Sequence, residues 1–181
     1  MKKLIILILI LIIVTGIIKA ENIFTGLQTG YFFPSNKVFK ELYGRGFYLS
    51  GEVGIDVWKK TSLFLGLRYF SKKGELSYTK EETTLEIIPI HLGVRLRLSE
   101  QKINPFLGAS ISLNFFRENV PLQAVSEIKL GFLVETGIFI RISKRYFIKF
   151  DFNYNYCQIK PFHTKINIGG INAGFGLKYC F

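Results

Sequence analysis

From about residue 21 onward, apolar side chains alternate with polar residues or glycine, with a period of two. The last segment, residues 171–181, is the clearest case. Its odd positions carry Ile, Ala, Phe, Leu, Tyr and Phe, while its even positions carry Asn, Gly, Gly, Lys and Cys. A period of two places alternate side chains on opposite faces of a β-strand, whereas a helix repeats every 3.6 residues. The alternation therefore predicts an all-β fold.

Eight segments show this alternation: residues 23–33, 49–57, 63–69, 88–98, 107–115, 129–141, 146–157 and 171–181. Most of them reach the roughly 9–11 residues that a tilted strand needs to cross a bilayer. The connections alternate strictly between long (34–46, 72–84, 116–127, 160–167) and short (59–61, 99–103, 143–145). Outer-membrane barrels have short periplasmic turns and longer outer loops. The sequence thus predicts an eight-stranded antiparallel up-and-down transmembrane β-barrel with both mature termini in the periplasm.

The first twenty residues have the composition of a secretory signal peptide. Lys2 and Lys3 are followed by an uninterrupted apolar stretch, Leu4 to Val14, and then by a short segment that ends at Ala20. This layout predicts cleavage after Ala20, with an uncleaved anchor as the alternative. We therefore divide the chain into a signal peptide, residues 1–20, and a single barrel domain, residues 21–181.

The two faces of the predicted strands differ in a way that distinguishes lipid from water. The chain is 49% apolar with a mean hydropathy of +0.27, yet beyond the N-terminus it has no run of the ~18 apolar residues that a membrane helix needs. A soluble lipocalin would turn its polar face to water. Here the polar face is rich in glycine and in charges of both signs, which suits a crowded lumen. The apolar face would be an aggregation surface in water, so we assign it to lipid.

An eight-stranded barrel is just wide enough for side chains to fill, so we expect its inward charges to pair with one another. The predicted interior charge network consists of Glu52, Asp56, Arg68, His91, Arg95, Arg97, Glu135, Arg141, Lys149, Asp151 and Lys178. A gated solute path along this network is the alternative. We expect no catalytic residues, no metal site and no cofactor, since neither His91 nor His163 lies in a His-x-Ser arrangement and no ligand cluster has metal spacing.

Two further local features yield expectations. Cys157 and Cys180 both face inward by parity, but a hairpin that turns near residues 163–164 separates them by about 33 Å along the strands. We therefore expect two free thiols. Val38, Phe39, Leu42 and Tyr43 recur at helical spacing in the first long loop and predict a short amphipathic helix over the barrel mouth or at the interface.

The C-terminal strand resembles that of the small outer-membrane β-barrel family of the OmpA/OmpX/OmpW type, a porin-like group of eight-stranded barrels. Gly176, Tyr179 and Phe181 match the family's Gly-x-x-aromatic-x-aromatic signal, although Gly174 stands where a polar residue is usual. The resemblance covers residues 21–181. It implies an outer-membrane location and recognition of these three residues by the barrel-assembly machinery during insertion.

The net charge of +11 raises the question of partners. We expect no nucleic-acid binding, because many cations are assigned to the interior and no recognition motif is present. Outer-membrane lipids are the expected surroundings. The following loop cations could contact lipopolysaccharide phosphates: Lys37, Lys40, Arg45, Lys72, Lys73, Lys80, Lys160 and Lys165. We expect a monomer with a structural or surface-interaction role. The alternatives are a narrow channel or lateral conduit for small apolar solutes and, less favoured, a lipid A-modifying enzyme.

Overall fold

The computed structural model of the chain describes residues 23–75, 82–120, 123–159 and 166–181. The predicted signal peptide and His163 lie outside these residues. The elements are β1 (Ile23–Pro34), α2 (Lys37–Tyr43), β2 (Gly46–Trp58), β3 (Thr61–Glu75), β4 (Glu82–Arg97), β5 (Ile103–Val120), β6 (Gln123–Arg141), β7 (Tyr146–Ile159), the two-residue β8 (Ile166–Asn167) and β9 (Gly170–Cys180). The described residues contain no helix long and apolar enough to cross a membrane.

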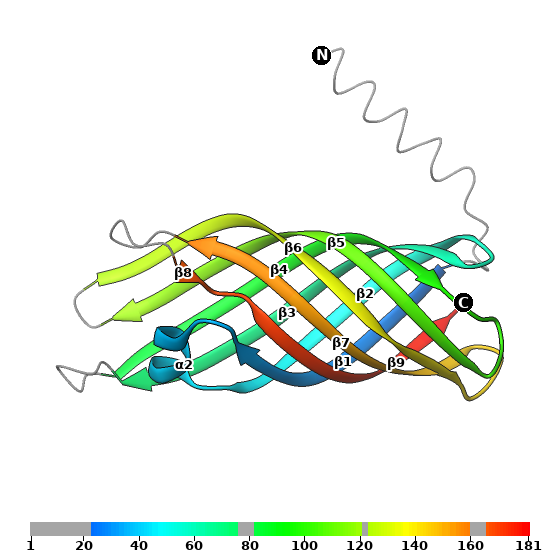
Figure 1. Ribbon diagram of the computed structural model, residues 1–181, viewed down its shortest axis with the longest axis horizontal. Helices are drawn as coiled ribbons and strands as arrows, with labels where there is room; N and C mark the ends of the chain where they lie inside the picture. The colour runs from blue at the N-terminus through cyan, green and yellow to red at the C-terminus, as the bar shows by residue number, and fades with distance from the viewer. Residues whose placement is uncertain (1–22, 76–81, 121–122, 160–165) are drawn as a thin grey trace, which may run out of the picture.

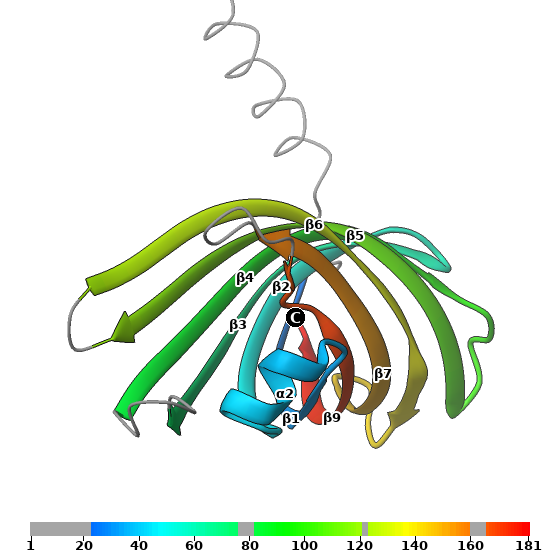
Figure 2. The same ribbon diagram turned by 60° about the vertical axis from the view of Figure 1, so that its left-hand side comes forward.

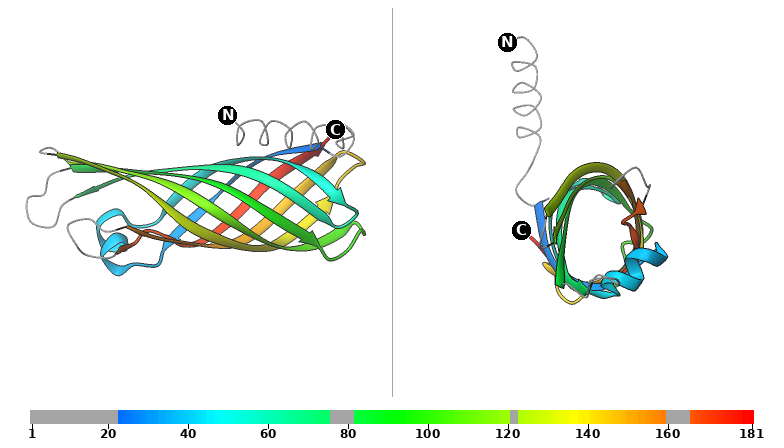
Figure 3. Two further views of the ribbon diagram at one scale, coloured as in Figure 1. Left: turned by 90° about the horizontal axis from the view of Figure 1, so that it is seen from above. Right: turned by 90° about the vertical axis from the view of Figure 1, so that its left-hand side faces the viewer.

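The eight long strands close into a ring (Figure 3). Each strand pairs antiparallel with its neighbour in sequence, and β1 also pairs with β9 from Phe24 opposite Cys180 to Pro34 opposite Gly170. The short β8 pairs only with β7. Because the ring is closed, none of the eight long strands is an edge strand of the barrel wall, as hydrocarbon requires. The predicted eight-stranded up-and-down β-barrel is confirmed.

Side chains alternate around this ring as the sequence predicted. In β5, Leu107 and Ile111 are exposed on the outer surface, whereas Ser110 and Ser112 are buried inside. The same alternation on the other strands produces an outer belt of exposed Leu, Ile, Val and Phe around the wall that the strands of Figure 1 form. The belt and the filled lumen are the two consequences of a period of two in a closed sheet.

The β3–β4 and β5–β6 hairpins are longer than predicted, which corrects two of the loop assignments. Strand β3 continues to Glu75 and β4 begins at Glu82, so most of the expected loop 72–84 is strand. Likewise β5 continues to Val120 and β6 begins at Gln123, both within the expected loop 116–127. The outer faces of these extensions are polar, so the sequence shows no apolar alternation there. The backbone ladder nevertheless continues, because strand pairing needs no apolar outer face.

Proline interrupts one ladder without opening the barrel. The β3–β4 pairing stops at Leu67 opposite Ile90 and resumes at Phe70 opposite Ile87. Pro89 lies within this gap and has no backbone N–H to donate. On its other side Pro89 remains opposite Asn114 of β5. The strand thus tolerates proline at the cost of one local irregularity.

The barrel contents form layers along the axis. An apolar cluster that includes Phe32, Phe70, Leu85 and Phe116 fills the end next to α2. A smaller cluster, Phe106, Phe139 and Phe147, lies toward the end with the short turns. Charged and amide side chains occupy the space between. The lumen is therefore a packed core with a polar middle.

The predicted amphipathic helix is confirmed as α2, at the rim of the barrel mouth (Figure 2). Asn36 caps it, since its Oδ1 accepts a hydrogen bond from the backbone N–H of Phe39 at 3.1 Å. Phe39 and Tyr43 are buried in the apolar cluster, whereas Val38 is exposed. Gly44 ends the helix at φ 67°, a conformation that favours glycine. The helix covers the apolar contents of the mouth with its own aromatic face.

Candidate functional site

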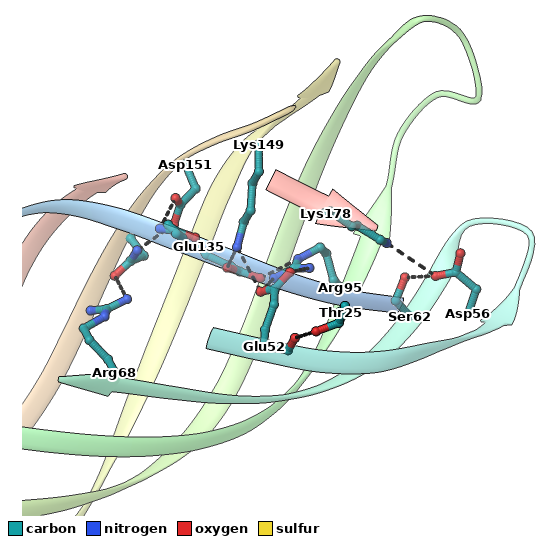
Figure 4. Close-up of polar contacts among 12 residues, drawn as sticks. Thr25, Glu52, Asp56, Ser62, Arg68, Arg95, Glu135, Lys149, Asp151 and Lys178 are labelled. Atoms are coloured by element: carbon teal, nitrogen blue, oxygen red, sulfur yellow. Dashed lines mark hydrogen bonds and ion pairs between the residues drawn. The ribbon is translucent and has the colours of Figure 1, made fainter. Parts of the chain in front are cut away.

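The centre of the lumen is built around Arg95, whose side chain is fully buried. Its Nη1 and Nη2 donate to Glu52 Oε1 and Oε2 at 3.1 and 2.9 Å, in a two-pronged pairing. Its Nε donates to Glu135 Oε1 at 2.7 Å. These contacts join β2, β4 and β6 across the barrel (Figure 4). Two carboxylates with fixed geometry are what a buried guanidinium needs to be tolerated.

Lys149 of β7 completes a compact cluster of two cations and two anions. Its Nζ lies 3.1 Å from Glu52 Oε2 and 3.7 Å from Glu135 Oε2. All four side chains are at most 10% exposed. Each charge faces at least one opposite charge at hydrogen-bonding or ion-pair distance, so the cluster is neutral as a unit.

Aromatic rings enclose the guanidinium of Arg95. Its central carbon lies 4.3 Å from the ring centre of Phe64, 5.0 Å from that of Phe106 and 5.4 Å from that of Phe139. The electron-rich faces of these rings attract the cation while excluding water. The sequence interpretation assigned the inward face to charge and glycine and missed this aromatic enclosure. The signal was available, because all three phenylalanines occupy inward positions of their strands.

A second polar group lies between the central cluster and the α2 end. Asp151 accepts hydrogen bonds from Gln28 Nε2 at 2.6 Å and from Asn153 Nδ2 at 2.7 Å. Asn153 in turn accepts from Arg68 Nη2 at 3.2 Å. The guanidinium of Arg68 also lies 4.4 Å from the ring centre of Tyr48. Amide side chains thus link Asp151 and Arg68, two charges of the predicted network.

A third group lies toward the short turns. Asp56 accepts from Ser62 Oγ at 2.6 Å and pairs with Arg97 at 3.1 Å. Lys178 Nζ is 3.9 Å from Asp56 and 3.5 Å from the ring centre of Phe24. Figure 4 shows this group beyond the central cluster along the axis. The charges therefore occur in successive small groups.

Two members of the predicted network lie apart from these groups. Arg141 is exposed at the rim, where its Nη2 donates to the backbone oxygen of Glu100 at 3.0 Å. Its inclusion in the interior is corrected here: inward parity at a strand end points a long side chain out of the lumen. His91 is inside and buried, edge-on to Phe64, and its Nδ1 has no hydrogen-bond partner among the described residues.

Tyr43 anchors α2 to the barrel mouth. Its hydroxyl donates to Glu118 of β5 and lies 3.3 Å from Thr83 Oγ1 of β4. Burial, together with the neighbouring Glu118 carboxylate, raises the pKa of the Tyr43 phenol well above its ordinary value. The helix is therefore fastened to two strands through a hydroxyl that keeps its proton. The sequence predicted the helix but not this attachment.

The lumen retains little empty space among the described residues. The inner cavity next to Tyr48, Arg68, Asn155 and Asn172 holds about 20 Å³, which is the size of one water molecule. A second small hollow of about 60 Å³ lies beneath α2, lined by Leu42, Ile159 and other apolar residues. The larger hollows lie on the outer wall. Within the described part of the chain, no three His, Cys, Asp or Glu side chains gather as metal ligands do.

Both cysteines are free, as predicted, but the register that led to this expectation was wrong by two residues. A turn near residues 163–164, as expected from the sequence, would place Cys157 near Gly170 and Cys180 near Phe147. In the structure Cys157 accepts from the N–H of Ile168, and the N–H of Cys180 donates to Arg145. The turn itself, expected near residues 163–164, lies outside the described residues. A shift of two residues preserves the facing of every side chain, so the inward assignment stands.

The residues of the C-terminal signal lie at the short-turn end of β9. Gly176 faces inward, where an added Cβ would meet the backbone oxygen of Leu27 and the side chain of Gln28. Tyr179 packs against Tyr146 and Phe181 with ring centres 5.1 and 5.0 Å apart. The aromatic pair thus belongs to a girdle at that rim, and the glycine leaves room for Gln28.

Comparisons with known proteins identify the architecture. No family model and no curated protein sequence matches the chain. Solved structures do. Neisserial surface protein A matches with a TM-score of 0.69 at 16% identity, over 88% of this chain and 97% of that one. The fold is that of the small outer-membrane β-barrels. The outer membrane protein OprG of Pseudomonas aeruginosa (TM-score 0.63, 12% identity, 88% and 97% covered) and the N-terminal barrel domain of OprF from the same species (0.60, 12%, 89% and 98%) share it.

Proposed function

We propose that the protein is a monomeric outer-membrane barrel that acts through its outer surfaces and conducts no solute along its axis. The belt of exposed Leu, Ile, Val and Phe on a closed sheet supports a membrane location, since water would make such a surface adhesive. The fold shared with outer-membrane proteins supports the same location. The short turns and both ends of the described chain lie at one end (Figure 1), which we place in the periplasm.

The observation that carries the non-conducting role is the double obstruction of the lumen. The Arg95 cluster spans the barrel between the four strands β2, β4, β6 and β7, and the aromatic residues of α2 and its neighbours fill the outer mouth. A hydrated ion would have to separate buried charge pairs and then pass an apolar layer. Both steps are costly in a lumen whose inner cavity fits one water molecule.

Planar-bilayer recording tests this role. The purified barrel is expected to produce no steady single-channel openings. A variant with Phe39→Ala and Tyr43→Ala removes the cap and leaves the Arg95 cluster intact, so it too is expected to stay closed. Persistent openings of uniform size in the unmodified protein would contradict the proposal. Openings in the cap variant alone would assign the obstruction to α2 rather than to the charges.

A lateral conduit for small apolar solutes is the second candidate, and the hollow beneath α2 is the observation that favours it. That hollow is lined mainly by apolar side chains, with Glu118 as its one charged lining residue, and lies at the mouth between α2 and strands β5, β7 and β8. Its volume of about 60 Å³ is small, and Phe39 and Tyr43 close it toward the lumen. Liposome uptake of a small hydrocarbon such as toluene, compared between the protein and a Leu42→Trp variant that fills the hollow, tests it. Equal uptake would reject the conduit.

A non-catalytic role is supported by the surroundings of His91. Ser112, a hydroxyl on the same inner face, lies opposite His91 in the β4–β5 register. Its Oγ is engaged with Asn114 and Asn155, and both His91 and Ser112 are at most 5% exposed. A substrate would have no route to either group. For external partners, we propose that Lys37 and Lys40, which are both exposed on α2, contact lipopolysaccharide phosphates.

A further inference from the structure

The end of the barrel with the short turns carries a concentration of positive charge. All three turns lie within the described residues, and every one of them, or the strand end beside it, has exposed cations. These are Lys59, Lys60, Lys102, Arg141, Lys144 and Arg145. Glu100 is the single exposed acidic side chain in the same turns. A rim of this composition attracts anionic headgroups at a membrane surface.

One of these cations lies at the end of an apolar groove on the outer wall. The groove has a volume of about 450 Å³ and runs along β1 and β9, lined by Thr25, Leu27, Thr29, Leu49, Leu177 and Tyr179. The two threonines create the hollow, because their short side chains stand in the same outer belt as exposed leucines. From Thr25 to Thr29 the groove spans roughly 14 Å along the strand.

Aromatic residues join the groove to the cation. Tyr179 forms the short-turn end of the groove and packs against Tyr146, with ring centres 5.1 Å apart. The hydroxyl of Tyr179 accepts a hydrogen bond from Arg145 Nη1 at 3.4 Å. Arg145 remains exposed, with the exposed Lys144 next to it. The apolar groove therefore ends at the guanidinium of Arg145, at the level where aromatic residues mark a membrane interface.

We propose that this groove binds one anionic phospholipid, with an acyl chain along Thr25–Thr29 and the phosphate on Arg145. The inference rests on the proposed membrane location. Charge complementarity favours this occupant. The apolar lining of the groove suits an acyl chain, and the exposed Arg145 at its end suits a phosphate. The neighbouring turns contain a single exposed acidic side chain, Glu100, that would repel it. An arginine suits the phosphate because its planar fork donates two parallel hydrogen bonds.

The outer wall supplies a matched comparison groove. A second hollow of about 370 Å³ is lined by Leu107, Val134, Thr136 and Phe152, with no cation among its lining residues. Thr29 and Thr136 are both exposed, and each donates to a backbone oxygen, Thr29 to Tyr48 at 3.0 Å and Thr136 to Phe106 at 3.2 Å. Thr29→Phe and Thr136→Phe therefore remove equivalent hydrogen bonds and fill different grooves.

Native mass spectrometry of the folded barrel, titrated with dioleoyl phosphatidylglycerol or dioleoyl phosphatidylcholine, tests the proposal. We expect one retained lipid, with phosphatidylglycerol favoured roughly fivefold or more, the order of one to two surface cations. Lys144→Ala with Arg145→Ala should bring the two lipids to equal retention. Thr29→Phe should reduce retention of both lipids, whereas Thr136→Phe should leave both unchanged.

Several results would overturn the proposal. These are equal retention of the two lipids by the unmodified protein, a preference that survives loss of Lys144 and Arg145, or equal losses in the two threonine variants. A dimer that Thr29→Phe abolishes would assign the groove to a second copy instead. If the cation variant does not fold, raising the salt from about 50 mM to about 500 mM replaces it, since screening should remove the preference. Channel openings would contradict the proposed function without altering these lipid ratios.

Discussion

Glu135 Oε1 accepts a 2.7 Å hydrogen bond from Arg95 Nε, deep in the lumen. The other oxygen of the same carboxylate lies 3.7 Å from Lys149. The negative charge of Glu135 therefore partly neutralises two buried cations, Arg95 and Lys149. Its removal should be felt more strongly than the loss of any pair at the rim.

Glu135→Gln should lower the free energy of unfolding by roughly 3–5 kcal/mol, because it leaves a buried positive charge uncompensated. Urea unfolding in lipid vesicles, followed through the single tryptophan Trp58, measures the change. Glu127→Gln is the matched control on the same strand: its pair with Lys129 is 3.5 Å long and partly exposed, so about 1 kcal/mol or less is expected. Adding Lys149→Gln to Glu135→Gln should restore much of the loss. Equal effects of Glu135→Gln and Glu127→Gln would contradict the neutral cluster.

Gly66 leaves the space that His91 occupies. An added Cβ at residue 66 would overlap His91 Nε2, so Gly66→Ala should destabilise the barrel by about 1–3 kcal/mol. A second change, His91→Ala, should relieve most of that loss. Gly51→Ala is the control, since nothing lies closer than 3.8 Å to its added Cβ. The same unfolding assay applies, and a Gly66→Ala loss that His91→Ala does not relieve would reject the steric account.

The hydroxyl of Tyr43 should make the attachment of α2 depend on pH in the alkaline range. Its pKa is higher in the folded protein than in the unfolded chain, chiefly because of burial and then because of Glu118. The contribution of Tyr43 to the free energy of unfolding is therefore complete below the ordinary phenol pKa of about 10 and falls as pH rises above it. Urea unfolding of the wild type and of Tyr43→Phe, measured from about pH 8 to 11, should show an additional loss of stability at high pH only in the wild type. Parallel curves would show that Tyr43 does not supply the dependence.

The two thiols should differ in reactivity and should not join. Cys157 is fully buried, whereas Cys180 is partly exposed near the rim. A maleimide reagent should label Cys180 first and Cys157 only after unfolding, as counted by intact mass. Cys180 pairs in register with Arg145, twelve residues along β7 from Cys157, or roughly 40 Å of strand. An intramolecular disulfide in the folded protein would contradict this register.

The sequence was sufficient to predict the barrel, because a period of two on eight segments admits few other closed arrangements. Leu107 and Ser110 face opposite ways for that reason alone. It was less informative where the outer face becomes polar. Strand β5 continues to Val120 and β6 begins at Gln123, although the outer residues of these extensions show no apolar alternation. The register of the hairpin after β7 was also wrong, since a shift of two residues leaves the alternation unchanged.

Within the lumen, parity predicted which charges face inward but not which of them meet. Glu52 reaches Arg95 and Lys149 because strand tilt and stagger bring β2, β4 and β7 to one level. Asp151 instead meets the amides of Gln28 and Asn153. Arg141 leaves the lumen because its strand ends there. Such partnerships depend on axial position, which alternation does not specify.

We infer that hydrocarbon contacts one face of every strand, while the opposite face fills the lumen. Single cysteines placed in turn at residues 107–113 of β5, in a background that lacks Cys157 and Cys180, can carry a fluorophore into vesicles of brominated lipid. We predict strong quenching at 107, 109, 111 and 113, and weak quenching at 108, 110 and 112. Uniform quenching along the strand, or stronger quenching at the even positions, would contradict the account.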